Sequence, residues 1–264
     1  MEIFAYSFMI RALLAGLMVA IIAPLIGNFL VMKRFAMVAD TLSHVALAGV
    51  AVGLLTATQP IFATILLTVL SAILIEKIAS KQKMPAETAL ALFMPGGLAV
   101  ALLLISLANG FNSNLFSYLF GSITTVSSQE IYLIIGLGLV SLLLIGKFYQ
   151  QLLFTCFDEE GARLKGIKTE RVNLLLMVLT AVTVSLTMRV VGALLVSALM
   201  VIPVVAAMRV GRSFKQSFVY SILFAVLAVF FGLLGAFYFN LPAGGAIVLV
   251  ALLIFAVASV VGRK

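Results

Sequence analysis

Residues 243–261 read AGGAIVLVALLIFAVASVV, a run without a charged side chain. A helix needs about 20 mostly apolar residues to cross a bilayer, so this run predicts a membrane-spanning helix. Eight similar runs precede it, and the tight turn at 187–189 leaves eight or nine crossings compatible with the pattern. The predicted spans cover residues 9–31, 37–56, 61–79, 85–108, 129–147, 172–188, 190–208, 217–239 and 243–261.

The composition agrees with a polytopic membrane protein. The chain has 264 residues, of which 64 % are hydrophobic and only 10 % are charged. Soluble domains are about 45–50 % apolar and about 25 % charged, so an ordinary soluble enzyme is excluded. The single cysteine, Cys156, excludes a disulfide scaffold. We predict one all-α transmembrane domain over residues 1–264, whose first span is retained because no cleavable signal pattern precedes it.

The basic residues predict the orientation in the membrane. Cytoplasmic loops carry an excess of Lys and Arg, and 15 of the 17 basic residues fall in alternate loops, leaving Arg11 and Arg189 for the other side. We therefore expect an outer N-terminus and a cytoplasmic C-terminus in the cell (cytoplasmic or inner) membrane. The net charge of +8 then reflects topology, and nucleic-acid binding is excluded. The cytoplasmic group comprises Lys33, Arg34, Lys77, Lys81, Lys83, Lys147, Arg163, Lys165, Lys168, Arg171, Arg209, Arg212, Lys215, Arg263 and Lys264.

Asp40 and His44, early in the second predicted span, are the candidate metal ligands. A spacing of four places both on one helix face, and ionisable groups within a span usually face a polar cavity or a partner. Together they could bind one divalent cation, although a second copy across a symmetry axis would be needed for four ligands. Two alternatives remain open: the two side chains hydrogen-bond each other, or Asp40 is an interfacial charge facing the helix dipole.

Small residues and prolines mark a candidate path or packing surface. Gly49 and Gly53 form a small-xxx-small pattern, which lets helices approach closely. Gly192 and Pro203 lie in a stretch rich in Gly, Ala and Ser, where Pro203 is expected to break the backbone ladder, as Pro95 does in the fourth span.

The largest cytoplasmic loop contains a polar island that predicts a short helix. Asp158 suits its N-cap, acidic residues its first turn, basic residues its last, and Gly166 the position after its end. The island is either a solvated loop helix or a docking helix for a cytoplasmic partner. The candidate docking residues are Phe157, Asp158, Glu159, Glu160, Gly161, Ala162, Arg163, Leu164 and Gly166.

The sequence contains no phosphate-binding loop of the form G-x-x-x-x-G-K-[ST] and no dinucleotide-binding glycine motif. A chain of this kind that moved a solute with ATP would depend on an ATPase in another subunit.

Taken together, these motifs resemble those of the permease subunits of the zinc/manganese/iron ABC importers. The resemblance runs in order through residues 37–51, 118–121, 157–167, 191–203 and 241–244, and it is closest to the zinc-uptake branch. It implies a type II importer-like permease fold, a homodimer, a cytoplasmic ATP-binding subunit and an extracytoplasmic metal-binding protein. The chain itself would be no enzyme and would hold no cofactor of its own.

The resemblance also assigns roles to residues. Asp40 and His44 would coordinate the transported Zn²⁺, or Mn²⁺ or Fe²⁺ in the same architecture, and the segment at about 155–171 would couple ATP hydrolysis to transport. The rival hypothesis is a proton-driven secondary metal transporter, in which Asp40 and His44 act as a proton relay.

Overall fold

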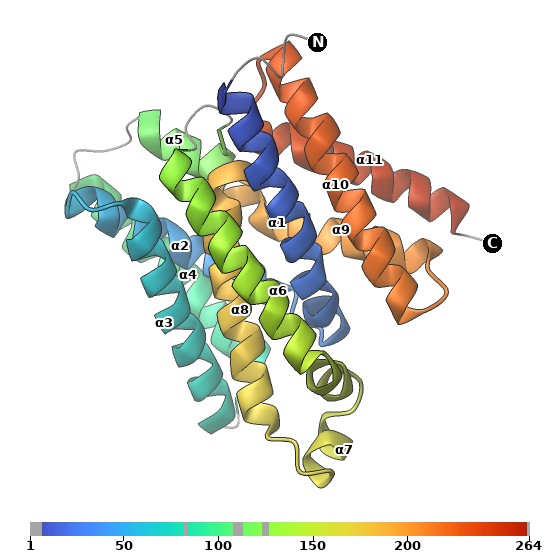
Figure 1. The fold of residues 1–264 in the computed structure, drawn as a ribbon. Coiled ribbons are helices and arrows are strands. Elements are labelled where there is room, and N and C mark those ends of the chain that lie inside the picture. Colours follow the sequence, from blue (N-terminus) through green and yellow to red (C-terminus); the bar gives the residue numbers. More distant parts are fainter. Residues whose placement is uncertain (1–6, 82–83, 108–112, 123–126, 263–264) are drawn as a thin grey trace. The chain divides into compact units, whose positions relative to one another are not determined.

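The computed structural model describes residues 7–81, 84–107, 113–122 and 127–262, and every regular element within these ranges is a helix (Figure 1). In the described part of the chain nine helical segments, with Ala193–Val210 counted as one, are long and apolar enough to cross a membrane, which confirms the all-α polytopic prediction. The elements are α1 (Ser7–Met32), α2 (Met37–Leu55), α3 (Pro60–Lys81), α4 (Ala86–Leu107), α5 (Ser113–Phe120), α6 (Ser128–Phe157), α7 (Glu159–Leu164), α8 (Thr169–Val191), η2 (Ala193–Leu195), α9 (Val196–Val210), α10 (Phe214–Phe239) and α11 (Ala243–Val261).

Two predicted boundaries are wrong by several residues. Helix α6 continues to Phe157, ten residues past the predicted end of its span. Its 30 residues correspond to about 45 Å at a rise of about 1.5 Å each, more than the hydrocarbon core of about 30 Å requires. The break predicted at 187–189 lies instead at Gly192, whose φ of 90° is readily available only to glycine. Arg189 therefore belongs to α8.

The prolines do not interrupt their helices. Pro95 lies inside the continuous helix α4 and Pro203 inside α9, so the breaks predicted at these two positions are wrong. A proline removes one backbone donor, and a helix can continue through it when neighbouring protein or local adjustments satisfy the freed carbonyl.

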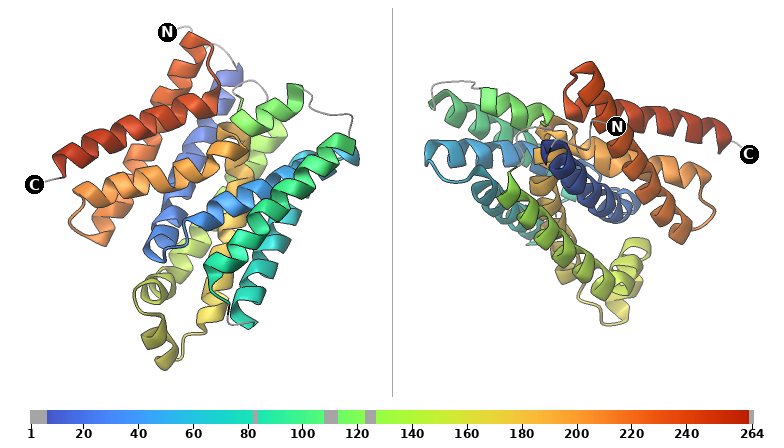
Figure 2. Two further views of the ribbon diagram at one scale, coloured as in Figure 1. Left: turned by 180° about the vertical axis from the view of Figure 1, so that it is seen from behind. Right: turned by 45° about the horizontal axis from the view of Figure 1, so that its top comes forward.

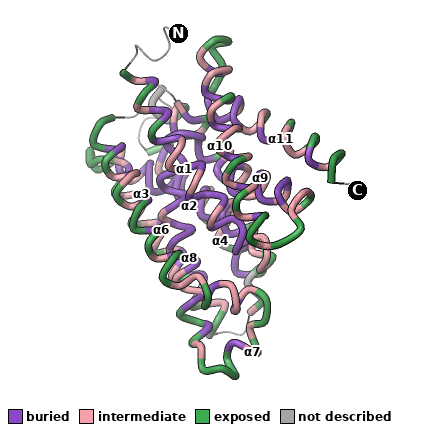
Figure 3. Tube along the Cα trace, turned by 45° about the vertical axis from the view of Figure 1, so that its right-hand side comes forward, coloured by how far each residue is buried: buried purple, intermediate pink, exposed green. Residues whose placement is uncertain are grey.

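The structure divides into two compact units, and the single-domain organisation stays a prediction. The unit formed by residues 29–111 and 139–185 contains α2, which packs against both α3 and α4. Helix α2 is buried along most of its length (Figure 3). A Cβ on Gly49 would lie 2.5 Å from Thr64 Cα, and one on Gly53 would lie 2.5 Å from Pro60 Cα. Both glycines therefore permit the close approach of α2 and α3.

The other unit comprises residues 1–28, 112–138 and 186–264. In it α9, α10 and α11 pack against one another, and α9 and α11 run side by side (Figure 2). Three glycines allow the backbones to cross where α5, η2 and α11 meet. Gly121 and Gly192 have positive φ values of 74° and 90°, and a Cβ on Gly244 would collide with the carbonyl oxygen of Val191.

Candidate functional site

Asp40 and His44 lie on α2, one helical turn apart. The helix begins at Met37, so Asp40 is in its first turn, where the helix dipole favours a negative charge. The Ser43 hydroxyl donates a hydrogen bond of 2.7 Å to the Asp40 carbonyl oxygen. Both candidate ligands are partly exposed, although most residues around them on α2 are buried. The helix thus presents a carboxylate and an imidazole from an otherwise apolar, buried surface.

One atom of this pair is unsatisfied. His44 Nδ1 is buried and has no hydrogen-bond partner, and the same holds for the hydroxyl of Thr41 in the preceding turn. A hydrogen bond between His44 Nδ1 and Asp40, one form of the packing alternative, is therefore not made. Buried polar atoms in native proteins nearly always have a partner, and an unpaired ring nitrogen offers the lone pair that a transition metal binds.

Asp40 and His44 are two candidate ligands, fewer than the four that a zinc site takes. Among the residues that the structure describes, no group of three or more His, Cys, Asp or Glu side chains could hold a metal ion. The metal role of Asp40 and His44 stays a prediction.

The candidate docking helix α7 is defined by caps at both ends. Asp158 is its N-cap, and its side chain accepts a hydrogen bond of 2.8 Å from the Gly161 N–H. At the other end, the Ile167 N–H donates to the Ala162 carbonyl and the Gly166 N–H to the Arg163 carbonyl, at 3.0 and 2.9 Å. Gly166, with a φ of 81°, makes this Schellman-type end possible.

Two exposed apolar side chains lie at α7, one on the helix itself and one at the end of α6 just before it. Leu164 is 90 % exposed and Phe157 is 60 % exposed, whereas Ala162 is completely buried beneath the helix. Glu160, Gly161 and Arg163 lie on the same short helix. A cavity of about 620 Å³ lies alongside, lined by residues that include Phe148, Ile167 and Arg171. This arrangement suits a protein partner, and the coupling role stays a prediction.

The sequence reasoning did not identify the buried charge cluster formed by Glu130, Arg189 and Tyr118. Arg189 and Glu130 form an ion pair, and each side chain is 9 % exposed. The guanidinium carbon lies 4.5 Å from the Tyr118 ring centroid. Burial raises the pKa of Tyr118 above its usual 10.0, and Arg189 offsets part of that rise. The sequence does contain an indication of this cluster, because Arg189 is a single basic residue in a long apolar run and would need a partner there.

The comparisons with known proteins identify the family. The sequence profile of the ABC 3 transport family matches residues 5–262. The chain belongs to the ABC 3 transport family. The high-affinity zinc uptake system membrane protein ZnuB of Haemophilus influenzae is 31 % identical over 95 % of the chain and 96 % of that protein. The manganese import system permease protein ScaB of Streptococcus gordonii is 30 % identical over 98 % of the chain and 93 % of that protein.

A solved structure has the same fold as this ABC 3 family chain. In the structure of PsaBC from Streptococcus pneumoniae in complex with Fab, one chain matches with a TM-score of 0.87 and 31 % identity, over 97 % of this chain and 92 % of that one. The predicted importer-permease fold is therefore confirmed. The family assignment also confirms that the chain is a transport permease and not the subunit that hydrolyses ATP.

Proposed function

We propose that this ABC 3 family chain imports a divalent first-row metal ion into the cytoplasm, driven by ATP hydrolysis in a separate subunit. The observation that carries the proposal is the buried, unpaired His44 Nδ1, one turn from Asp40 on α2. Relatives named for zinc and for manganese transport support a metal cargo, and membership of an ABC family supports ATP over a proton gradient as the energy source.

Asp40 and His44 are the proposed metal ligands on the path. An oxygen and a nitrogen from each of two protomers would give four ligands, which is why we propose a homodimer. Gly49 and Gly53 would hold α2 close to α3 beside that path, while Gly192 and Pro203 would shape the backbone of the other unit.

Zinc is the proposed cargo, with manganese and iron as the alternatives. Imidazole nitrogen suits zinc, and carboxylate oxygen suits manganese, so the ligand types do not discriminate between them. The relatives named for the two metals are 31 % and 30 % identical, which gives no preference. The zinc proposal therefore rests on the resemblance of the sequence, which is closest to the zinc-uptake branch.

The proposed orientation places the N-terminus outside and α7 in the cytoplasm of a cell-membrane protein. An ATP-binding subunit would then contact the exposed Leu164 and Phe157, and closure of that subunit would move α7. An extracytoplasmic binding protein would deliver the ion to the opposite side.

The test is ion uptake into proteoliposomes that contain the chain with its co-expressed ATP-binding subunit. Radioactive Zn²⁺, Mn²⁺ and Fe²⁺ are supplied separately with ATP, and Asp40→Ala and His44→Ala are compared with the wild type. We expect uptake of the cargo ion to fall at least tenfold in both variants while ATP hydrolysis persists. Glu87→Ala, which removes an exposed carboxylate from α4, is the matched control and should transport normally. Wild-type uptake by both ligand variants would refute the assignment.

A further inference from the structure

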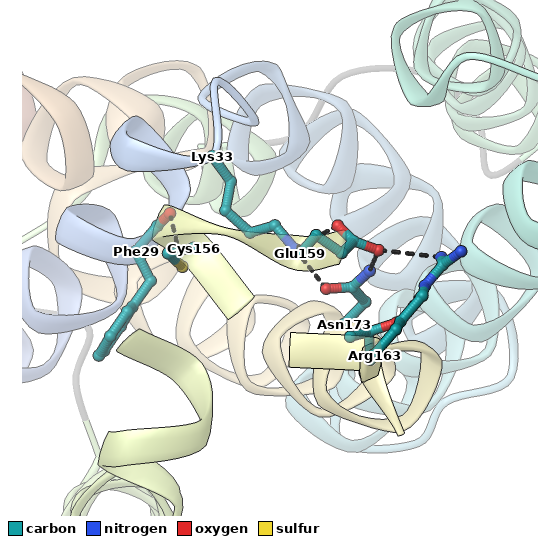
Figure 4. A network of polar contacts seen from close by, with 7 residues as sticks. Phe29, Lys33, Cys156, Glu159, Arg163 and Asn173 are labelled. Atoms are coloured by element: carbon teal, nitrogen blue, oxygen red, sulfur yellow. Dashed lines mark hydrogen bonds and ion pairs between the residues drawn. The ribbon is translucent and has the colours of Figure 1, made fainter. Parts of the chain in front are cut away.

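A buried lysine, Lys33, joins three helices of the unit that contains α2. Lys33 directly follows α1, and its side chain is only 6 % exposed. Its Nζ donates hydrogen bonds to Glu159 Oε2, at 3.3 Å, and to Asn173 Oδ1 (Figure 4). A buried ammonium group is costly unless it is paired, so these two contacts fix the position of the lysine head.

The two partners of Lys33 belong to different helices and also bond each other. Glu159 is the first residue of α7, and Asn173 lies in the first turns of α8. The Asn173 side-chain amide donates a hydrogen bond of 3.3 Å to Glu159 Oε1. We name these three residues the Lys33 latch. Because each member contacts the other two, α7 cannot move away from the end of α1 without exposing or separating charged groups.

The chain between Lys33 and α2 is short and internally hydrogen-bonded. The Phe35 N–H donates to the Leu30 carbonyl at 2.7 Å, and the Val38 N–H donates to the Phe35 carbonyl at 3.0 Å. The second of these bonds already belongs to the start of α2. Asp40 follows Lys33 by seven residues, so this short linker joins the lysine to the turn of α2 that carries the carboxylate.

A second ion pair of Glu159 does not reach α1. Arg163 Nη2 lies 3.2 Å from Glu159 Oε1, but both residues belong to α7. Arg163 Nε donates to the Thr169 hydroxyl at 2.9 Å, which links α7 to the start of α8 only. Within the described residues, the contact between Lys33 and Glu159 connects α7 with the linker that leads to the candidate metal ligands.

We propose that the Lys33 latch transmits the movement of α7 to α2, so that ATP-driven displacement of the docking helix repositions Asp40 and His44. Lys33 is a positioning residue in this scheme, since it touches neither the ion nor the nucleotide. The proposal rests on the proposed function, because it presumes that α7 contacts the ATP-binding subunit and that α2 carries the metal ligands.

The first test measures uptake of Zn²⁺, Mn²⁺ and Fe²⁺, each supplied separately, and ATP hydrolysis in the same proteoliposomes, with the full complex of chain, ATP-binding subunit and binding protein. Lys33→Met and Asn173→Leu should hydrolyse ATP within about twofold of the wild-type rate but import at least tenfold fewer ions per ATP. Lys33→Arg, which keeps the charge and the donors, should restore at least half of the wild-type ratio. Lys77→Met makes the same change at an exposed lysine of α3 and is the control.

The ratio of ions to ATP separates the latch from a merely structural role. An unchanged ratio in Lys33→Met overturns the proposal, whether the two rates stay normal or fall together through poor assembly. If the wild-type complex imports none of the three metals, the proposed function fails instead.

The second test follows the helices themselves and needs no cargo. Spin labels are placed at Lys165→Cys, the exposed C-cap of α7, and at the exposed Met37→Cys on α2, in a Cys156→Ser background of the whole complex. With an intact latch, the distance between the labels should keep one narrow distribution with and without trapped nucleotide. In Lys33→Met the distribution should broaden or shift when nucleotide is trapped. Identical distributions with and without the latch would overturn the proposal.

Discussion

The ion pair of Glu130 and Arg189 allows a quantitative prediction about stability. Both Glu130 oxygens are engaged: Oε1 contacts Arg189 and Oε2 accepts a hydrogen bond of 2.9 Å from the Ser127 N–H. The Glu130 N–H in turn donates to the Ser127 hydroxyl at 3.3 Å, which completes a capping box at the start of α6. Glu130→Gln can keep the cap through its amide oxygen, but it removes the charge and replaces the oxygen that faces Arg189 with an NH2 donor.

The expected loss in the free energy of unfolding follows from the burial of the two side chains, each of which is 9 % exposed. Removing one member of a buried pair costs about 3–5 kcal/mol, because the other charge is left without compensation. In Glu130→Gln the Tyr118 ring still stabilises the guanidinium by about 0.5–2 kcal/mol, so we expect a loss near the lower end. Arg189→Met removes both contacts and should lie near the upper end. The double variant Glu130→Gln/Arg189→Met should lose less unfolding free energy than the sum of the two single-variant losses.

The assay is equilibrium unfolding in mixed lipid–detergent micelles, titrated with a denaturing detergent and followed by helical circular dichroism. Glu87→Gln, at an exposed carboxylate in the first turn of α4, is the matched control and should change the free energy of unfolding by less than about 0.5 kcal/mol. The reasoning is refuted if the double variant loses the sum of the two single losses within about 0.5 kcal/mol, because the two charges would then be independent.

Three further outcomes are expected from single changes. Gly192→Ala should cost more than about 2 kcal/mol of unfolding free energy, because its φ is 90° and the new Cβ would meet Gly121, whereas Gly136→Ala has open space and should be neutral or stabilising. Asp158→Ala should weaken binding of the ATP-binding subunit about fivefold in a surface binding assay, through loss of about 1 kcal/mol of capping, and Asp158→Asn should not. The phenol of Tyr118 should titrate above 10.0 in an absorbance titration, because burial raises its pKa, and higher still in Arg189→Met. Since the folded pKa is the higher one, its contribution to stability should be full below pH about 10 and lost as the pH rises through the folded value.

The helices could be predicted because each one depends on residues that are close together in the sequence. Apolar runs of about 20 residues gave nine spans, and the polar island gave the caps of α7, since Asp158 and Gly166 act on neighbouring backbone groups. The extension of α6 to Phe157 was missed although residues 148–157, FYQQLLFTCF, are mostly apolar, because Lys147 was assigned to the cytoplasmic side and the predicted span ended there. A basic residue marks the side of the membrane, but it does not end the helix, whose backbone hydrogen bonds continue beyond the bilayer.

The polar contacts could not be predicted in the same way, because they join residues far apart in the sequence. Lys33 and Glu159 are separated by 126 positions, and nothing local at either residue points to the other. Glu130 and Arg189 are the exception. On the predicted outer side, Arg11 and Arg189 are the only bases and Glu2 and Glu130 the only acids. The rule that charges within a membrane pair with one another would have suggested their contact.

His44 Nδ1 differs from the buried charges of Glu130 and Lys33, because it has no hydrogen-bond partner. Glu130 is satisfied by Arg189, and Lys33 by Glu159 and Asn173, so these charges contribute to the folded state of their own units. His44 Nδ1 is buried with no such partner, and an unpaired buried polar atom lowers the stability of the folded state. The spacing of Asp40 and His44 fits several roles, but a ring nitrogen without a partner favours the proposal that His44 binds an ion during transport, because a bound ion would supply the missing partner.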